Sequence, residues 1–156
     1  MGKRGLTSYL CGAVLMAGTA MADCDAGTLA LRGDFGEVRF SVDVADDASE
    51  RAQGLMFVEE MGTFEGMLFV FEAPQTTSFW MRNTLIPLDM VFIGADGVVD
   101  HIHENAVPLD ETPIFGGDDI QYVLEVNGGL SARLGLSVGD EVQHPSVAGN
   151  VLWPCD

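Results

Sequence analysis

Basic residues are scarce in this sequence. Its 156 residues include only seven lysines and arginines, of which Lys3 is the single lysine, against 24 aspartates and glutamates. A surface of that sign repels the phosphates of DNA and RNA, so the composition argues against a nucleic-acid-binding protein. It favours high solubility, or adaptation to salty surroundings, over the recruitment of a basic partner.

Long apolar runs are also missing after residue 22, so no membrane span is expected there. The first 22 residues have the parts of a cleavable signal peptide: a basic start at Lys3 and Arg4, an apolar core from Leu10 to Ala17, and the small-x-small site Ala20-Met21-Ala22. Cleavage after Ala22 predicts a periplasmic or secreted protein. Removing these 22 from the 156 residues leaves 134, with five arginines against 24 acids and a formal net charge of −19.

Cysteine is scarce as well, with three in the chain. Cys11 lies in the predicted leader, which leaves Cys24 and Cys155 near the two ends of the mature chain. In an oxidising compartment such a pair is expected to form a disulfide, and this bond would place both chain ends side by side. Neither cysteine belongs to a Cys-x-x-Cys motif, so a redox-active pair is disfavoured.

Short runs with a period of two predict a mainly β structure of the α+β class, in a single domain at residues 23–156. A curled sheet or barrel with two short helices is expected. The first helix begins after Asp47 and ends at Gly54, and the second covers 130–134. Residues 73–77 are expected to end a strand, and residues 105–119 to form a long ordered loop. The expected strands are 29–32, 38–44, 66–71, 78–82, 89–93, 98–103, 120–126 and 141–144.

The stretch from Ser78 to Ile93, SFWMRNTLIPLDMVFI, embeds one arginine, one asparagine and one aspartate in an otherwise apolar run. Polar groups in such a run need partners when the chain folds, because an unpaired buried charge is too costly. The stretch is therefore either a structural lock or the wall of a site.

This stretch, together with Arg51–Met56 (RAQGLM) and Gly66–Phe71 (GMLFVF), resembles the prokaryotic DUF192 family, a domain of unknown function. The closing pattern 122–126, 133–135 and 139–142 also fits, and the resemblance covers about residues 37–143. It implies a compact, β-rich and often exported domain, with no established activity and no catalytic residues to transfer. The family commonly has lysine where this chain has Arg82, and arginine favours a bidentate carboxylate partner.

The candidate ligand-binding residues are the polar members of these motifs and the aromatic residue beside them: Trp80, Arg82, Asn83, Asp89 and Arg51. In the functional interpretation, Arg82 and Asn83 donate hydrogen bonds to a ligand such as a carboxylate or a sugar. In the structural interpretation, Arg82 or Arg51 pairs with Asp89 as a buried lock between strands, which is favoured at a fixed register of a small β fold. An alternating strand must also turn either Phe79 or Trp80 outward.

A metal site is the alternative, formed by His101, His103 and Glu104, with Asp100 alongside. Two histidines on one strand face plus a carboxylate are suited to a divalent ion, and His144 could approach as a further ligand. Exposed strand histidines without a metal are the more ordinary outcome. The five mature methionines suggest core packing more than copper(I) binding.

The sequence thus predicts an exported, non-enzymatic module that binds an unidentified small molecule or protein and needs no cofactor. A metal-binding protein or metal-dependent enzyme is the first alternative, and a structural partner-binding domain without a pocket is the second.

Overall fold

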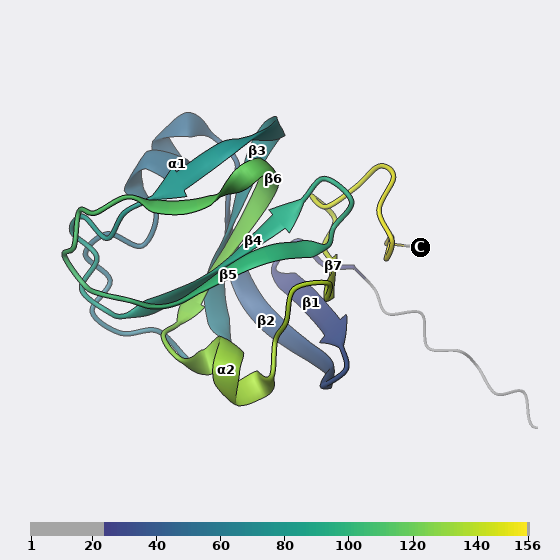
Figure 1. The fold of residues 1–156 in the computed structure, drawn as a ribbon, viewed down its shortest axis with the longest axis horizontal. Coiled ribbons are helices and arrows are strands. Elements are labelled where there is room, and N and C mark those ends of the chain that lie inside the picture. Colours follow the sequence, from purple (N-terminus) through teal and green to yellow (C-terminus); the bar gives the residue numbers. More distant parts are fainter. Residues whose placement is uncertain (1–23, 156) are drawn as a thin grey trace, which may run out of the picture.

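A computed structural model describes residues 24–155, so the predicted signal peptide lies outside the described residues. Seven strands form one sheet in the order β5-β4-β6-β3-β2-β1-β7 (Figure 1). Among residues 24–155, no helix is long and apolar enough to cross a membrane. The elements are β1 (Thr28–Gly33), β2 (Gly36–Ala45), α1 (Ala48–Gln53), β3 (Glu65–Phe79), β4 (Leu88–Gly94), β5 (Val99–Ala106), β6 (Ile114–Asn127), α2 (Leu130–Leu134) and β7 (Glu141–Gln143).

The sheet curls until its two edges meet. Val98, just before the edge strand β5, pairs with Glu141 of the opposite edge strand β7. The backbone N–H of Val99 also donates to Asp140 O at 2.9 Å, and that of Val142 to Gly97 O at 2.8 Å. These bonds cover part of the unpaired backbone that an open sheet would expose at its edges. The predicted curled, mainly β domain is confirmed.

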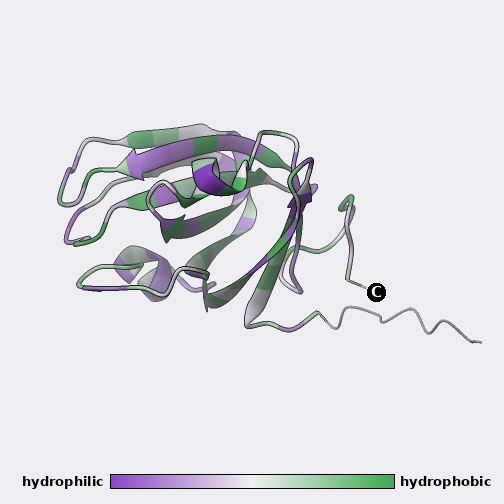
Figure 2. Ribbon diagram, turned by 90° about the horizontal axis from the view of Figure 1, so that it is seen from below, coloured by the Kyte–Doolittle hydropathy of each residue, from purple (hydrophilic) through white to green (hydrophobic). Residues whose placement is uncertain are grey.

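The two faces of the sheet bury two different apolar clusters. The first lies inside the curl and includes Phe40, Val91, Leu124 and Val126. The second lies on the other face of β3, β4 and β6, where α1 and the loops cover it, and includes Leu55, Phe69, Met90 and Phe92. Figure 2 shows the result as alternating hydrophobic and hydrophilic bands along the strands. Because successive strand residues point to opposite faces, each position is assigned to one cluster by its register.

Helix α1 begins as its sequence predicts. The Asp47 side chain accepts hydrogen bonds from the backbone N–H groups of Ser49 at 2.7 Å and Glu50 at 2.9 Å, and Glu50 returns a bond to the backbone of Asp47. This capping box satisfies donors that have no partner inside the helix. Gly54 ends the helix with a φ of 50°.

Two predicted boundaries are wrong. Residues 73–77 do not end a strand, since β3 continues to Phe79, and the loop expected at 105–119 is shorter, since β6 begins at Ile114. The extra segments pair with each other, with register shifts between Val70 and Ser78. The β3–β6 register has no pair at Pro74, so the proline does not remove a ladder bond. The sheet also contains an unexpected parallel pair, β2 and β3, joined through α1.

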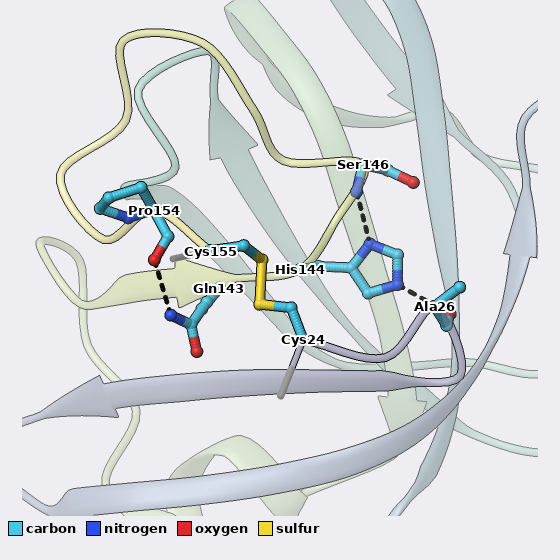
Figure 3. The surroundings of a disulfide bond; sticks show 7 residues. All are labelled: Cys24, Ala26, Gln143, His144, Ser146, Pro154 and Cys155. Carbon is cyan, nitrogen blue, oxygen red and sulfur yellow. Dashed lines mark hydrogen bonds between the residues drawn. A yellow bond between two sulfur atoms is a disulfide. The ribbon is translucent and has the colours of Figure 1, made fainter. Parts of the chain in front are cut away.

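The predicted disulfide is present. Cys24 and Cys155 are bonded with their Cα atoms 5.8 Å apart, across a sequence separation of 131 (Figure 3). Beside it, Gln143 donates to Pro154 O at 2.7 Å. His144 is fully buried: its Nε2 bonds Ala26 O at 2.9 Å, and its Nδ1 accepts from Ser146 N at 3.0 Å. Burial lowers the pKa of His144. Both chain ends are therefore fastened beside β1 and β7.

We expect the disulfide to contribute about 5 kcal/mol to the free energy of unfolding, because it closes a very long loop in the unfolded chain. Urea denaturation of residues 23–156, oxidised and reduced, measures this contribution. The Cys24→Ser/Cys155→Ser double variant is the control, since reductant should not change its midpoint. Titration of two free thiols in the unreduced native protein would contradict the prediction.

Candidate functional site

A pocket of about 180 Å³ opens between α1, β3 and the segment that follows β3. Three of the predicted site residues line it, namely Arg51, Trp80 and Arg82. The prediction that Phe79 or Trp80 turns outward is confirmed, since Trp80 is 46% exposed. The other lining residues are Ala52, Gln53, Gly54, Leu55, Met56, Phe69, Phe71, Ser78, Phe79, Thr84 and Glu125.

The pocket exists because β3 bends. The rings of Phe69 and Phe79 pack edge to face with centroids 5.0 Å apart, although the two residues are ten positions apart in one strand. A straight strand rising about 3.3 Å per residue would hold them roughly 33 Å apart. The register shifts between Val70 and Ser78 mark this bend, as β-bulges do elsewhere. The wall of the pocket is therefore one strand folded towards itself.

The two arginines of the pocket differ in their partners. Arg51 is held firmly: its Nη1 donates to Asp46 O at 2.6 Å and Val70 O at 2.8 Å, and its Nη2 bonds Glu72 at 2.9 Å. Arg82 is exposed and lies over the Trp80 ring, with Cζ 5.5 Å from the ring centroid. None of the ion pairs in residues 24–155 includes Arg82. Its guanidinium is therefore available to an anion at the mouth of the pocket.

Glu125 is the acidic residue of the pocket and is only 4% exposed. It lies on β6 opposite Met67 of β3 and Met90 of β4. Its neighbours Leu124 and Val126 belong to the cluster inside the curl, so its side chain points to the other face, which Phe69 and Leu55 share. Burial raises the pKa of Glu125 to about 8, and no hydrogen bond or charge within the described residues counteracts this. The carboxyl is therefore protonated at neutral pH.

Three loops meet beside the pocket in a constrained conformation. The backbone N–H of Phe57 donates to Asn83 O at 2.8 Å, and that of Leu109 donates to Thr84 O at 3.1 Å. Phe57, Asn83 and Leu109 all have positive φ angles, of 66°, 54° and 64°. Asparagine tolerates this region, whereas phenylalanine and leucine rarely adopt it. Residues held in this way are concentrated at functional sites.

Asn83 lies beside the pocket and does not line it. Its Nδ2 is 3.8 Å from Sδ of Met56, which is a lining residue. Its main contribution is its backbone, because the turn with positive φ brings its carbonyl to Phe57 N. The structure thus gives Asn83 a role in shaping the mouth, and the residue makes no contact inside the pocket.

Asp89 is a lock, but the ion pair expected with Arg82 or Arg51 is wrong. Asp89 is fully buried, and its carboxylate accepts three backbone N–H bonds, from Asn105 at 2.8 Å, Gly129 at 2.7 Å and Ser131 at 2.8 Å. These donors belong to the end of β5 and to the start of α2. The N-cap residue of α2 is Gly129, which has no side chain to accept bonds from these N–H groups. Asp89 pairs with Val126 and therefore faces the interior of the curl, on the side opposite Glu125. It cannot belong to the pocket.

The predicted metal ligands lie on the edge strand β5. His101 stacks on the Phe92 ring at 5.7 Å, while His103 and Glu104 border a different surface hollow. Residues 24–155 contain no group of three or more His, Cys, Asp or Glu side chains that could hold a metal ion. His144, which the sequence left open as a further ligand, does not join them, because both its ring nitrogens are hydrogen-bonded beside the disulfide (Figure 3).

The sequence analysis missed Glu125 and the phenylalanines of β3. A signal for Glu125 was present, since Ile120–Val126 (IQYVLEV) is apolar on both faces around it, as a strand buried on both sides would be. An acid in such a strand is buried whichever way it points. No comparable signal marked Phe79, because its contact with Phe69 depends on the bend.

Residues 30–144 match the family DUF192, described as "Uncharacterized ACR". The chain belongs to the DUF192 family. The match includes every lining residue of the pocket, whereas both disulfide cysteines lie outside it. The pocket is therefore built entirely from the DUF192 region, and the disulfide joins segments that flank this region.

Two solved structures resemble this DUF192 protein. A protein of unknown function from Novosphingobium aromaticivorans DSM 12444 is 47% identical, with a TM-score of 0.72 over 74% of this chain and 82% of that one. A protein of Sinorhizobium meliloti 1021, provisionally described as a transcription regulator, is 41% identical, with a TM-score of 0.73 over 77% of this chain and 94% of that one. The comparison with curated proteins found no match.

We expect Asp89→Ala to lower the free energy of unfolding by about 3 kcal/mol or more, because it leaves three buried N–H donors without an acceptor. Asp89→Asn should cost less, since its amide oxygen still accepts. Urea denaturation measures both, and Asp43→Ala on the exposed side of β2 is the matched control. A loss below about 1 kcal/mol for Asp89→Ala would refute the lock.

Glu125 should make stability depend on pH. Its pKa is raised from 4.5 to about 8 in the folded state, so unfolding releases a proton between these values. The folded state therefore loses stability as pH rises from about 5 to 8, with a slope approaching 1.4 kcal/mol per pH unit. Denaturation of the parent and of Glu125→Gln across this range isolates the effect. The variant should gain relative stability as pH rises, and parallel curves would contradict the prediction.

Proposed function

We propose that this DUF192 domain is an exported, non-enzymatic module that binds a small molecule in the pocket between α1 and β3. The observation that carries this proposal is the buried Glu125 carboxyl, which lines the pocket without a hydrogen-bonding partner among the described residues. Among the described residues, Ser131 Oγ is the one completely enclosed side-chain N or O atom without a partner, so the Glu125 oxygens remain accessible from the pocket. A ligand in the pocket could form hydrogen bonds with them.

The walls support binding of a partly apolar molecule. Phe69, Phe71, Phe79 and Trp80 line the pocket, and the exposed Arg82 adds donors that make no ion pair within residues 24–155. Convergence of a few polar groups on an aromatic cavity is the usual form of a ligand site.

The volume limits the ligand. About 180 Å³ is below the roughly 300–1,000 Å³ of sites for drug-sized molecules, and slightly above a cavity of about 150 Å³ that holds benzene. The pocket therefore fits a molecule of fewer than about ten non-hydrogen atoms. A nucleotide or a cofactor of similar size could place only a part of itself in this volume.

Export is supported by the predicted signal peptide and by the disulfide. A bond between Cys24 and Cys155 persists in an oxidising compartment such as the periplasm or the extracellular space. The strongly acidic composition also argues against DNA binding by this chain, although the Sinorhizobium relative is described as a transcription regulator.

A protein partner is the second candidate, favoured by exposed apolar side chains on the loops around the pocket. Phe57 is 67% exposed and Leu109 60%, and both are held in place with positive φ angles. Rigid, exposed apolar residues are typical of contact surfaces. The surface hollows beside the β5 histidines support no comparable proposal for a metal.

Fragment binding tests the proposal. The chain has two tryptophans, so Trp153→Phe leaves Trp80 as a reporter at the pocket. We expect small polar–apolar fragments to change Trp80 emission and to shift the NMR signals of α1 and β3. Ala52→Phe, on the exposed lining of α1, should block these changes, whereas Ala48→Phe on the same helix should not. If no fragment perturbs the pocket, or if both variants bind equally well, small-molecule binding is wrong.

A further inference from the structure

Glu125 and Arg82 both line the pocket, and neither side chain makes an ion pair within residues 24–155. Glu125 is only 4% exposed whereas Arg82 is exposed, so the two side chains lie at different depths of the pocket. Arg51 is already bonded to two carbonyls and to Glu72, so it does not compete for an incoming anion. The pocket therefore offers one acid and one guanidinium to whatever enters.

The walls between these groups select what can bridge them. Aromatic faces attract an ammonium group, and four aromatic side chains line the pocket, of which Phe71 and Trp80 already lie against Arg51 and Arg82. A molecule with only a positive charge would be repelled by Arg82, whose charge is not paired with a carboxylate among the described residues. A molecule with only a negative charge would leave Glu125 without a matched partner. Opposite charges at the two ends of one ligand satisfy both.

We propose that the pocket binds a small zwitterion whose ammonium group meets the Glu125 carboxyl and whose carboxylate meets the Arg82 guanidinium. A short apolar chain between the two groups, as in an ω-amino acid, would lie against the phenylalanines. This inference rests on the proposed function and names its ligand class. The volume of about 180 Å³ agrees with a molecule of about seven to nine non-hydrogen atoms, by comparison with the benzene-sized cavity.

Binding would be coupled to proton release. In the empty pocket the pKa of Glu125 is about 8, raised by burial alone. Met67 and Met90 face it from the neighbouring strands and do not titrate, while Arg51 and Arg82 are the charged groups of the same pocket. An entering ammonium pairs with the ionised carboxylate, so the proton of Glu125 leaves to the buffer.

The test uses 4-aminobutanoate, 5-aminopentanoate and 6-aminohexanoate as probes, with pentylamine and pentanoate as the matched single-charge compounds. Calorimetry with the oxidised mature chain should show at least one zwitterion binding about tenfold or more tighter than either single-charge compound. Equal or tighter binding of pentylamine or pentanoate would overturn the proposal, as would failure of all three zwitterions to bind.

Substitutions of Glu125 and Arg82 test which end of the ligand each residue binds. Glu125→Gln should reduce the affinity for the best zwitterion to that of pentanoate, and Arg82→Gln should reduce it to that of pentylamine. Arg39→Gln, which removes an arginine outside the pocket, is the control and should change nothing. Unchanged affinity in either pocket variant would remove that residue from the site and overturn the proposal.

The pH profile separates this ligand class from its nearest rival. Affinity for the zwitterion should rise almost tenfold from pH 6 to pH 7 and level off above pH 8, because only ionised Glu125 accepts the ammonium. Glu125→Gln should give a flat profile. A carboxylic acid that receives a hydrogen bond from protonated Glu125 would bind less tightly above pH 8, and this result would overturn the proposal. If other fragments bind the pocket and the zwitterions do not, the ligand class is wrong while the binding function stands.

Discussion

The edge-to-face contact between Phe69 and Phe79 requires β3 to turn back on itself, and the pocket depends on that bend. The bend also brings Trp80 and Arg82, which follow the end of β3, to the same pocket as Phe69 of β3 and Arg51 of α1. Phe79 packs in turn on Phe92 of β4, with ring centroids 6.0 Å apart, so the bent segment is anchored to the central sheet. Aromatic pairs of this geometry contribute about 0.5–1.5 kcal/mol each beyond the area they bury. The wall of the site is thus part of the hydrophobic core.

Two buried acids on opposite faces of the sheet show how differently a fold can accommodate a carboxyl group. Asp89 accepts three backbone N–H bonds and joins β4, the end of β5 and the start of α2. Glu125 has no such partners, so it is protonated at neutral pH and borders a cavity. The contacts of Asp89 therefore have a structural role. Glu125 has a pKa raised by burial and lines a pocket, and this distinguishes a candidate site from a structural lock.

The family match and the two similar structures agree on the fold and supply no activity. The functional argument therefore rests on the chemistry of the pocket, as it must for any fold that can host unrelated functions. The pocket lies wholly within the family region, while Cys24 and Cys155 flank it. Binding and stabilisation are consequently separable in this molecule: the disulfide holds the chain ends beside β1 and β7, and the site is built on the bent strand β3, away from those ends.

The sequence by itself determined the mainly β class, the disulfide, the capping box of α1 and the outward position of one residue of the Phe79–Trp80 pair. Each of these follows from local periodicity, from side chains a few residues apart, or from a count of cysteines. It also drew attention to Arg51, Trp80 and Arg82, which line the pocket, because polar and aromatic residues stand out within apolar motifs.

Only the tertiary structure decided that Asp89 bonds backbone amides, that residues 75–79 and 114–120 pair, and that Glu125 faces the pocket. Those outcomes depend on which distant segments of the chain pair with each other. They also depend on the register of each pairing, which decides the face of the sheet that a side chain points to. No short stretch of the chain specifies the pairing or the register.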